Sequence, residues 1–254
     1  MPRIFTRKQF SNYLGETRAI DDIITSFIPT PDPSLLKNFE ADIPSTFTTY
    51  NGYNVWLNSL DLSELDCALN LINGPVVVPD YGGGLYCDGA DNWFFSSAPA
   101  GCGWLTDSTW SLSLWIEPHD TYIGYQRIIS TADQKFEVGI SNGRIAIYTN
   151  GTWKSNLSGV LGVNQPTMIT FTYNASLAGG RVVLKVNGPV PSLTTINSNG
   201  SVSPYLGSIT FSSYYGGLAD WFEATWYKIK YWNRELDIAE IDEIYNNEKS
   251  QYGY

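Results

Sequence analysis

Short runs in which apolar and polar residues alternate fill the chain from residue 76 almost to its C-terminal end. Examples are SLSLWIEP, MITFTYN and RVVLKVNG, and an Asn142-Gly143 pair stands between KFEVGIS and RIAIYTN. Alternation with a period of two is typical of half-buried strands, and Asn-Gly between two such runs predicts a β-hairpin. Many short strands with turn signals between them predict an antiparallel β-sandwich or barrel for residues 76–254.

A helical pattern replaces this alternation in residues 1–33. Apolar side chains recur there with helical spacing, and the run PTPDPS after them predicts an extended, semi-stiff connector. We therefore expect a short, mainly helical and extended arm that anchors the protein on a partner; the alternative is that it folds back over a sandwich edge. The expected partner-anchoring residues are Arg3, Phe5, Arg7, Ile20, Ile23, Ile24, Phe27 and Ile28.

Residues 34–75 lack a regular strand pattern, and we expect an irregular linking segment with one short helix. The helix is predicted by a stripe at Leu62, Leu65, Leu69 and Ile72. Asp61 and Glu64 before it resemble a capping box, and a Gly-Pro pair ends it.

Composition and charge exclude several classes of protein. With 43% hydrophobic and 16% charged residues, the 254-residue chain is globular. Its formal charge of −10 opposes binding to phosphate backbones, so we expect no nucleic-acid partner. No run has the length of a signal peptide core or a membrane span, which predicts synthesis in the cytosol without export and no membrane insertion.

Cysteine and histidine are scarce. The cysteines are Cys67, Cys87 and Cys102, and His119 is the single histidine. With no C-x-x-C pair a zinc site has almost no candidate ligands, and a single loop histidine does not predict a catalytic triad. Cys87 and Cys102 could close a small loop by a disulfide, but we expect buried free thiols.

Four segments, taken in order, resemble the laminin-G-like, concanavalin A-like lectin jelly rolls. They are GLYCDGADNWFFSS, STWSLSLWIEP, TMITFTYNASLAGGRVVLKVNGP and GGLADWFEATWYKIKYWNRELDIAEIDEIYNNE. The resemblance covers about residues 80–248 and implies an all-β jelly-roll sandwich, closed by a short helix after Asn233-Arg234. Domains of this kind usually act outside cells.

The run ELDIAE has the carboxylate spacing of laminarinase-type glycoside hydrolases, with Glu235 and Glu240 as the candidate catalytic pair. Those enzymes hold two carboxylates on one strand facing a cleft. Here an apolar helical pattern follows, and on a helix the two glutamates lie on different sides. We therefore expect no catalytic residues and no enzyme activity.

Calcium is the cofactor to consider, since Asp88 and Asp91, with Asn92, could help to hold this ion as some relatives of the fold do near rim loops. Capping of turns is the alternative role for these residues. We favour that role and expect no cofactor.

Loop aromatics are the candidates for glycan contact. Trp153, Tyr214 and Tyr215 occur in surroundings rich in glycine and serine, where a flat ring can stack on a sugar. The alternative for such rings is a place in the core, which we expect for Trp226.

Together these observations favour a structural virion protein of a bacteriophage, of capsid-decoration or head-fibre type and less readily of the tail. Such a protein is assembled in the host cytoplasm and reaches the exterior by lysis, which reconciles an outward-acting fold with no export signal. Expected partners are capsid or tail proteins, further copies of the chain, with a trimer as the guess, and a host-surface glycan. The alternative is a carbohydrate-binding lectin module of a free or cell-surface protein, and the second alternative is a glycoside hydrolase.

Overall fold

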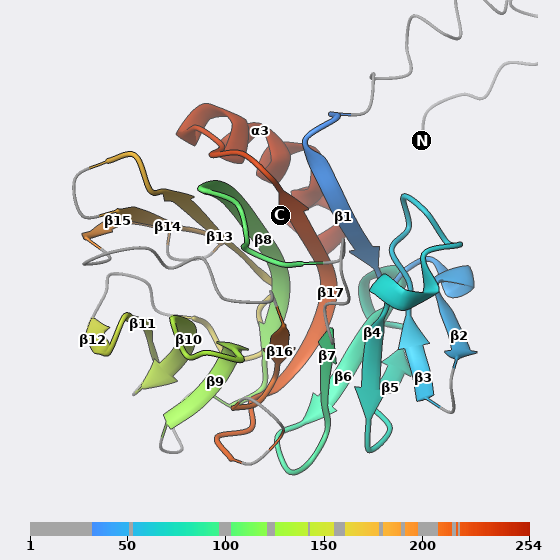
Figure 1. Cartoon of the computed structure of the whole chain (residues 1–254). Coiled ribbons are helices and arrows are strands. Elements are labelled where there is room, and N and C mark those ends of the chain that lie inside the picture. Colours follow the sequence, from blue (N-terminus) through green and yellow to red (C-terminus); the bar gives the residue numbers. More distant parts are fainter. Residues whose placement is uncertain are drawn as a thin grey trace, which may run out of the picture. The chain divides into compact units, whose positions relative to one another are not determined.

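Two antiparallel β-sheets packed face to face, with one α-helix on the outside, make up the described part of the protein (Figure 1). The computed structural model describes residues 32–50, 53–96, 103–120, 125–141, 143–154, 161–177, 180–188, 191–197, 208–214, 217 and 219–254. Both sheets belong to one compact unit, Ser34–Tyr254. The predicted all-β sandwich is therefore confirmed.

Sheet A is built around the neighbouring strands β8 and β17. Its order is β15 (Ser192–Asn197), β14 (Arg181–Asn187), β13 (Thr167–Asn174), β8 (Thr109–Pro118), β17 (Glu223–Trp232), β6 (Gly84–Asp88) and β5 (Val76–Val78), and β1 (Leu35–Glu40) pairs with the C-terminal half of β17. The central strands β8, β13 and β17 read as alternating or nearly continuous apolar runs, because one face lies in the core and the other is largely covered.

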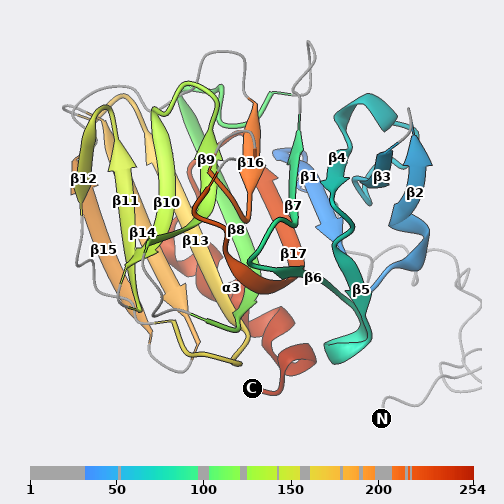
Figure 2. The same cartoon turned by 90° about the horizontal axis from the view of Figure 1, so that it is seen from below.

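Sheet B faces sheet A, and Figure 2 looks through its strands onto those of sheet A behind. Its order is β12 (Thr152–Lys154), β11 (Arg144–Thr149), β10 (Phe136–Ser141), β9 (Tyr125–Thr131), β16 (Ile209–Phe211), β7 (Trp93–Ser96), β4 (Leu69–Ile72), β3 (Tyr53–Trp56) and β2 (Phe47–Tyr50). Ser141 lies opposite Arg144, so β10 and β11 form the hairpin that the Asn-Gly pair predicts. Short 3-10 helices are η1 (Pro44–Thr46), η2 (Leu65–Cys67), η3 (Asp80–Gly82) and η4 (Lys249–Tyr252).

The expectation of a helix near residues 62–72 is wrong. Only η2 is helical there, and the stripe continues as strand β4, which pairs with β3 and β7 of sheet B. Leu69 and Leu71 are buried while the residues that alternate with them are half-buried, which is strand periodicity. The Asp61 carboxylate accepts hydrogen bonds from Ser63 and closes a local turn rather than capping a helix. Cross-strand pairing therefore overrides a helical spacing that extends over little more than ten residues.

Aromatic side chains fill the space between the sheets. Trp226 of β17 is fully buried, with edge-to-face contacts to Phe94 at 5.1 Å and Phe211 at 5.6 Å between ring centroids. Its indole nitrogen donates to the Ser212 hydroxyl at 2.9 Å, which satisfies the polar atom that burial would otherwise leave unpaired. The expectation that Trp226 is a core residue is confirmed.

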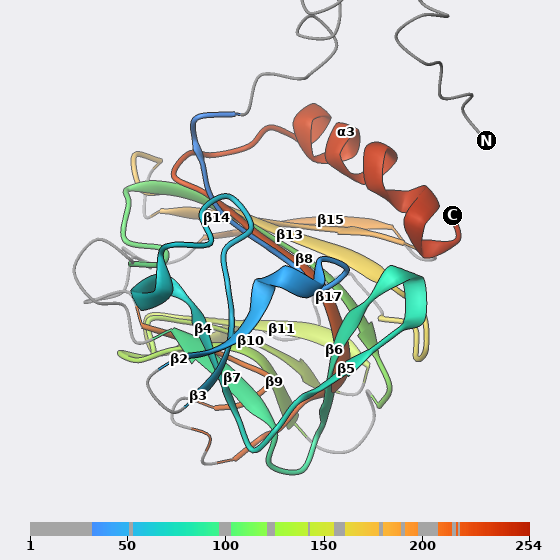
Figure 3. The same cartoon turned by 90° about the vertical axis from the view of Figure 1, so that its right-hand side faces the viewer.

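Helix α3 (Ile238–Glu248) covers the outer face of sheet A, and Figure 3 shows it on the side away from β10 and β11. Trp115 of β8 stacks on Tyr252 at 4.1 Å, and its indole nitrogen donates to Glu248 at 2.6 Å. Lys228 of β17 lies 3.5 Å from Glu248 and 3.1 Å from Glu40. This packing explains why outward positions of β8 and β17 are buried, and it confirms that the chain closes with a short helix on the sandwich.

The cysteines follow the expectation of buried free thiols only in part. Cys87 of β6 is buried in the core as a free thiol, so the expectation is confirmed for this residue and the alternative disulfide with Cys102 is wrong. Cys67 is disulfide-bonded, which corrects the expectation for that residue. Cys102 lies outside the described residues. In the part of the chain that the structure describes, no helix is both long and apolar enough to cross a membrane.

Candidate functional site

The outer face of β9, β10, β11 and β12 carries the most distinctive group of side chains in the described fold. Strand alternation points Ile145 and Ile147 of β11 into the core and leaves Ala146 between them on the outer face. A register shift between Val138 and Gly139 of β10 marks a bulge against β9. A bulge re-aims side chains, and here it lets consecutive isoleucines of β9 lie in the core while Tyr125 and Arg127 face outward.

Two small residues make room for rings on this face. Gly139 pairs with Arg127 on one side and with Ala146 on the other. A Cβ atom on Gly139 would lie 2.4 Å from the Tyr125 hydroxyl oxygen and 2.7 Å from the Gln126 carbonyl oxygen. The ring of Tyr125 can therefore lie over β10 only because this position has no side chain.

Arg127 stands at the centre of an aromatic cage. Its guanidinium carbon lies 4.7 Å from the ring centroid of Tyr125, 4.8 Å from that of Trp153 and 5.0 Å from that of Tyr214. The Tyr125 and Trp153 rings meet edge to face at 4.8 Å. Cation–π contacts of this kind fix the guanidinium and the rings relative to one another.

Two carboxylates hold the same guanidinium. Arg127 donates from Nη1 to Glu137, which is buried on β10, and from Nε to Asp220 at 3.3 Å. The backbone amide of Arg127 also donates to the Asp220 carbonyl at 2.7 Å. Asp220 has a φ of +56°, a left-handed conformation that few residues other than glycine adopt. Backbone and side-chain bonds to Arg127 together stabilise it there, and such conformations concentrate at functional sites.

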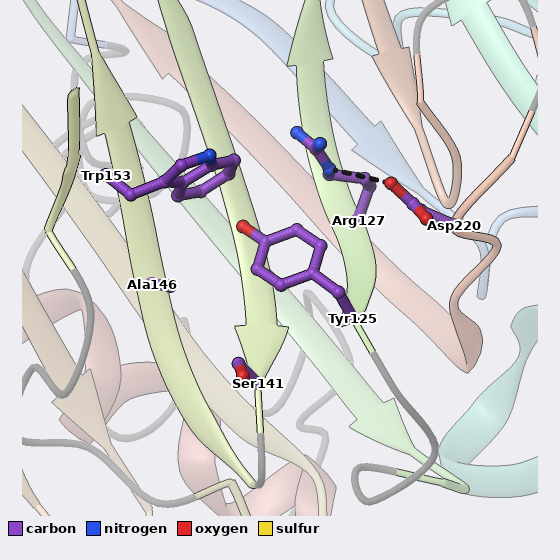
Figure 4. A pocket seen from close by; sticks show the side chains of 6 residues that line it. All are labelled: Tyr125, Arg127, Ser141, Ala146, Trp153 and Asp220. Atoms are coloured by element: carbon purple, nitrogen blue, oxygen red, sulfur yellow. Dashed lines mark hydrogen bonds and ion pairs between the residues drawn. The ribbon is translucent and has the colours of Figure 1, made fainter. Parts of the chain in front are cut away.

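These residues enclose an open pocket of about 450 Å³, which we call the cage pocket. Its lining residues are Tyr125, Arg127, Ser141, Ala146, Trp153 and Asp220, and Figure 4 shows the two rings and the Arg127–Asp220 pair around it. Trp153 is 36% exposed, and the Asp220 side chain is 34% exposed. Burial raises the pKa of Tyr125, so this residue remains a neutral phenol at physiological pH.

The surroundings of Arg127 bring together predicted and unpredicted residues. Trp153 and Tyr214, two of the three predicted glycan contacts, both place their rings against the Arg127 guanidinium, at 4.8 and 5.0 Å between guanidinium carbon and ring centroid. Tyr215 lies outside the described residues. The sequence patterns did not indicate Tyr125 and Arg127 of β9, Glu137 of β10 or Asp220 before β17. The alternating Tyr-Gln-Arg of β9 is the one local signal that could have indicated the first two.

The ELDIAE carboxylates have structural partners. Glu235 precedes α3, and it lies 2.9 Å from Arg181 and accepts from Asn174 at 2.6 Å. Asp237 is the N-cap of α3 and Glu240 completes a capping box with it, while Arg234 donates to Glu240 at 2.9 Å.

Glu235 and Glu240 nevertheless line one pocket of about 520 Å³ on the outer face of sheet A. The expectation that they lie on different sides of a helix is therefore wrong, because Glu235 is not helical. Both carboxylates are already bound, either in an ion pair or in the capping box.

Asp88, Asp91 and Asn92 form a turn between β6 and β7. The Asp88 carboxylate accepts from the amides of Ala90 and Asp91, and the Asn92 side-chain oxygen accepts from the Asp88 amide at 3.2 Å. These bonds match the turn-capping role. Within the described ranges, no group of three or more histidine, cysteine, aspartate or glutamate side chains could hold a metal ion.

The predicted anchoring residues of the arm all lie outside the described residues. The arm and its partners therefore stay predictions.

Comparison with known proteins identifies the fold alone. No protein-family model and no curated protein matches the chain. The botulinum neurotoxin serotype D/C binding domain is 16% identical with a TM-score of 0.59, and the match covers 84% of this chain and 52% of that one. The serotype D ligand binding domain in complex with N-acetylneuraminic acid is 15% identical with a TM-score of 0.59, covering 84% and 51%.

A third solved structure is the serotype D/C binding domain in complex with rat synaptotagmin II. It is 14% identical with a TM-score of 0.57, and the match covers 84% of this chain and 51% of that one. The chain thus spans about half the length of these structures. The likeness supports the jelly-roll β-sandwich fold that the sequence predicts.

Proposed function

We propose that the protein is a non-enzymatic carbohydrate-binding module and that the cage pocket on sheet B is its sugar site. The arrangement that carries the proposal is an exposed indole beside a fixed guanidinium and a solvent-facing carboxylate. A sugar ring has an apolar C–H face and a rim of hydroxyl groups. The Trp153 face matches the former, and Arg127 and Asp220 offer a donor and an acceptor to the latter.

Similar folds give the proposal further support. The solved structures of similar fold are binding domains, and one of them is in complex with N-acetylneuraminic acid. At these identities the likeness covers architecture and transfers no ligand, so the argument rests on the pocket of this chain. Glu235 is paired with Arg181 and Glu240 belongs to the capping box, which favours a structural role for them over a catalytic one.

Binding at a single pocket is expected to be weak. An aromatic contact of this kind contributes about 0.5 to 1.5 kcal/mol, and the pocket is open to solvent. Useful affinity then requires several copies acting together, as on a particle or in an oligomer.

A glycan array with the full-length protein tests the proposal. We expect binding to one class of glycan and loss of most of it in Trp153→Ala. The matched control is Leu193→Ala, which removes a 52% exposed apolar side chain from sheet A. Binding that survives Trp153→Ala, or that Leu193→Ala removes equally, would contradict the assignment of the pocket.

The place where the module is displayed stays a prediction. If the module is displayed on a bacteriophage particle, the test is to supply a chain without residues 1–33 to a phage that lacks the full-length protein. We expect the shortened chain to be absent from the particles that this phage makes. Mass spectrometry of purified particles measures this. Normal incorporation of the shortened chain would contradict an anchoring role for the arm.

A further inference from the structure

We infer that the cage pocket selects uncharged sugars over sugars that carry a carboxylate, and that Asp220 sets this preference. The inference rests on the proposed function, since it names the class of sugar for the same pocket. It follows from three features of the pocket: its charge balance, the engagement of its guanidinium donors, and the polarity of its ring faces.

The charge balance of the site is negative. One cation, Arg127, is paired with two carboxylates, those of Glu137 and Asp220. Glu137 is almost fully buried, with 3% of its side chain exposed, whereas 34% of the Asp220 side chain is exposed. An incoming carboxylate therefore meets Asp220 first, and juxtaposed like charges oppose binding.

Two of the three guanidinium nitrogens of Arg127 already donate to carboxylates, which leaves Nη2 to donate to a sugar hydroxyl. A guanidinium binds a carboxylate most strongly through two parallel N–H groups. In Arg127, Nη1 donates to Glu137 and Nε donates to Asp220, so each of the two parallel N–H pairs includes a nitrogen that already donates to a carboxylate. A ligand carboxylate that took the Nε side would displace Asp220 and leave two carboxylates side by side.

The remaining surfaces suit neutral hydroxyl groups and C–H bonds. An ionised carboxylate only accepts hydrogen bonds, so Asp220 can accept from a sugar hydroxyl but not from a ligand carboxylate. Arg127 covers part of the Trp153 ring, and the exposed remainder of this ring carries the negative part of the quadrupole, which attracts the slightly positive C–H groups of a sugar and repels anions. All three features favour a neutral ligand.

A preference for neutral sugars would distinguish this protein from a similar fold that binds an acidic sugar. N-acetylneuraminic acid, present in one of the solved structures, is an acidic sugar. Sialylated glycans are therefore the most informative probes beside neutral ones.

Matched pairs of sugars test the inference. The probes are lactose with sialyllactose, galactose with galacturonic acid, and glucose with glucuronic acid, measured with the full-length protein by glycan array and by calorimetric titration. We expect the neutral member of a bound pair to bind at least about tenfold more tightly at low salt. The ratio should fall as salt rises, because salt screens the repulsion.

Two charge variants locate the cause. Asp220→Asn removes the solvent-facing carboxylate, and asparagine tolerates the left-handed backbone at this position. We expect it to reduce the neutral-to-acidic ratio by about threefold or more. Asp237→Asn changes the net charge equally at the start of helix α3, where asparagine also serves as an N-cap, and it should leave the ratio unchanged.

The outcomes separate the inference from the proposed function. Equal or tighter binding of the acidic sugars, lost in Trp153→Ala, would overturn the inference and leave the sugar site in place. A ratio that Asp237→Asn lowers as much as Asp220→Asn would overturn the role of Asp220. Failure of all these sugars, and of every glycan on the array, to bind would overturn the proposed function as well.

Discussion

Close packing of individual residues determines the shape of the cage pocket. Tyr125 lies where it does because Gly139 has no side chain, and Arg127 is held by rings on one side and carboxylates on the other. Sequence patterns identified Trp153 and Tyr214 as candidate glycan contacts, but they did not identify Asp220, whose role depends on a backbone conformation and a distant partner.

The first residue-scale prediction concerns Gly139. In Gly139→Ala the added methyl group meets the Tyr125 ring and the backbone of β9, so the pocket must distort. We expect sugar binding to fall at least about tenfold and the free energy of unfolding to fall by about 1 to 3 kcal/mol, as overpacking typically costs. Array binding and urea denaturation measure these effects. Gly188→Ala is the control, because its added methyl meets the Thr167 side chain at 3.2 Å, away from the pocket. Unchanged binding in Gly139→Ala would contradict the described packing of Tyr125.

The second concerns the thiol of Cys87. Burial raises its pKa from an ordinary value near 9 to about 12. A raised pKa in the folded state stabilises the protein below about pH 9, and that contribution is lost as pH rises from about 9 toward 12, because the unfolded thiol ionises first. We expect no reaction with a thiol reagent at pH 8 in the folded protein and full reaction of this thiol after unfolding. The reaction that is lost in Cys87→Ala belongs to this thiol. Rapid reaction of Cys87 in the folded protein would contradict its burial.

At the scale of elements, local patterns predicted the regular strands and failed where pairing decided the outcome. The runs that became β8, β10, β11, β13 and β14 alternate over six or more residues, and the hairpin of β10 and β11 has its own turn signal. The stripe that became β4 has helical spacing, but pairing with β3 and β7 makes it a strand.

The cage pocket escaped prediction for a related reason. Sheet pairing and the loop before β17 bring its residues together, so no short stretch of sequence contains the constellation. Only the exposed aromatic residues carried a local signal.

The element-scale prediction concerns α3. The Asp237 carboxylate caps the helix by accepting from the Glu240 amide at 2.9 Å, and the Glu240 carboxylate accepts from the Asp237 amide at 2.8 Å. We expect Asp237→Ala to lower the free energy of unfolding by about 0.5 to 2 kcal/mol, without changing sugar binding on the other sheet. Urea denaturation with an array measurement checks both. Loss of sugar binding in this variant would indicate that sheet A carries the site.

At the scale of the whole molecule, the two outer faces of the sandwich have different roles. Helix α3 covers the outer face of sheet A, whereas β9 to β12 present the cage pocket on the outer face of sheet B. The described residues that line the cage pocket all lie between residues 125 and 220. We therefore expect the formation of the pocket to be independent of residues 1–33.

The prediction at this scale follows from that independence. A chain of residues 34–254 should fold with a melting temperature close to that of the full chain and bind the same glycans. Circular dichroism and array binding, with the full chain as control, measure this. A shortened chain that does not fold would show that the arm belongs to the core, and one that folds without binding would place the site elsewhere.

The central claim is that a sugar occupies the cage pocket against Trp153, and the indole N–H signals of the nine tryptophans test it most directly by NMR. Trp153→Phe identifies the Trp153 signal by its disappearance while keeping an aromatic ring. During titration with the neutral glycan that binds best on the array, we predict a saturable shift of the Trp153 signal, while the signals of the buried Trp110 and Trp226 stay in place. Saturation by the glycan with no shift at Trp153 would contradict the account.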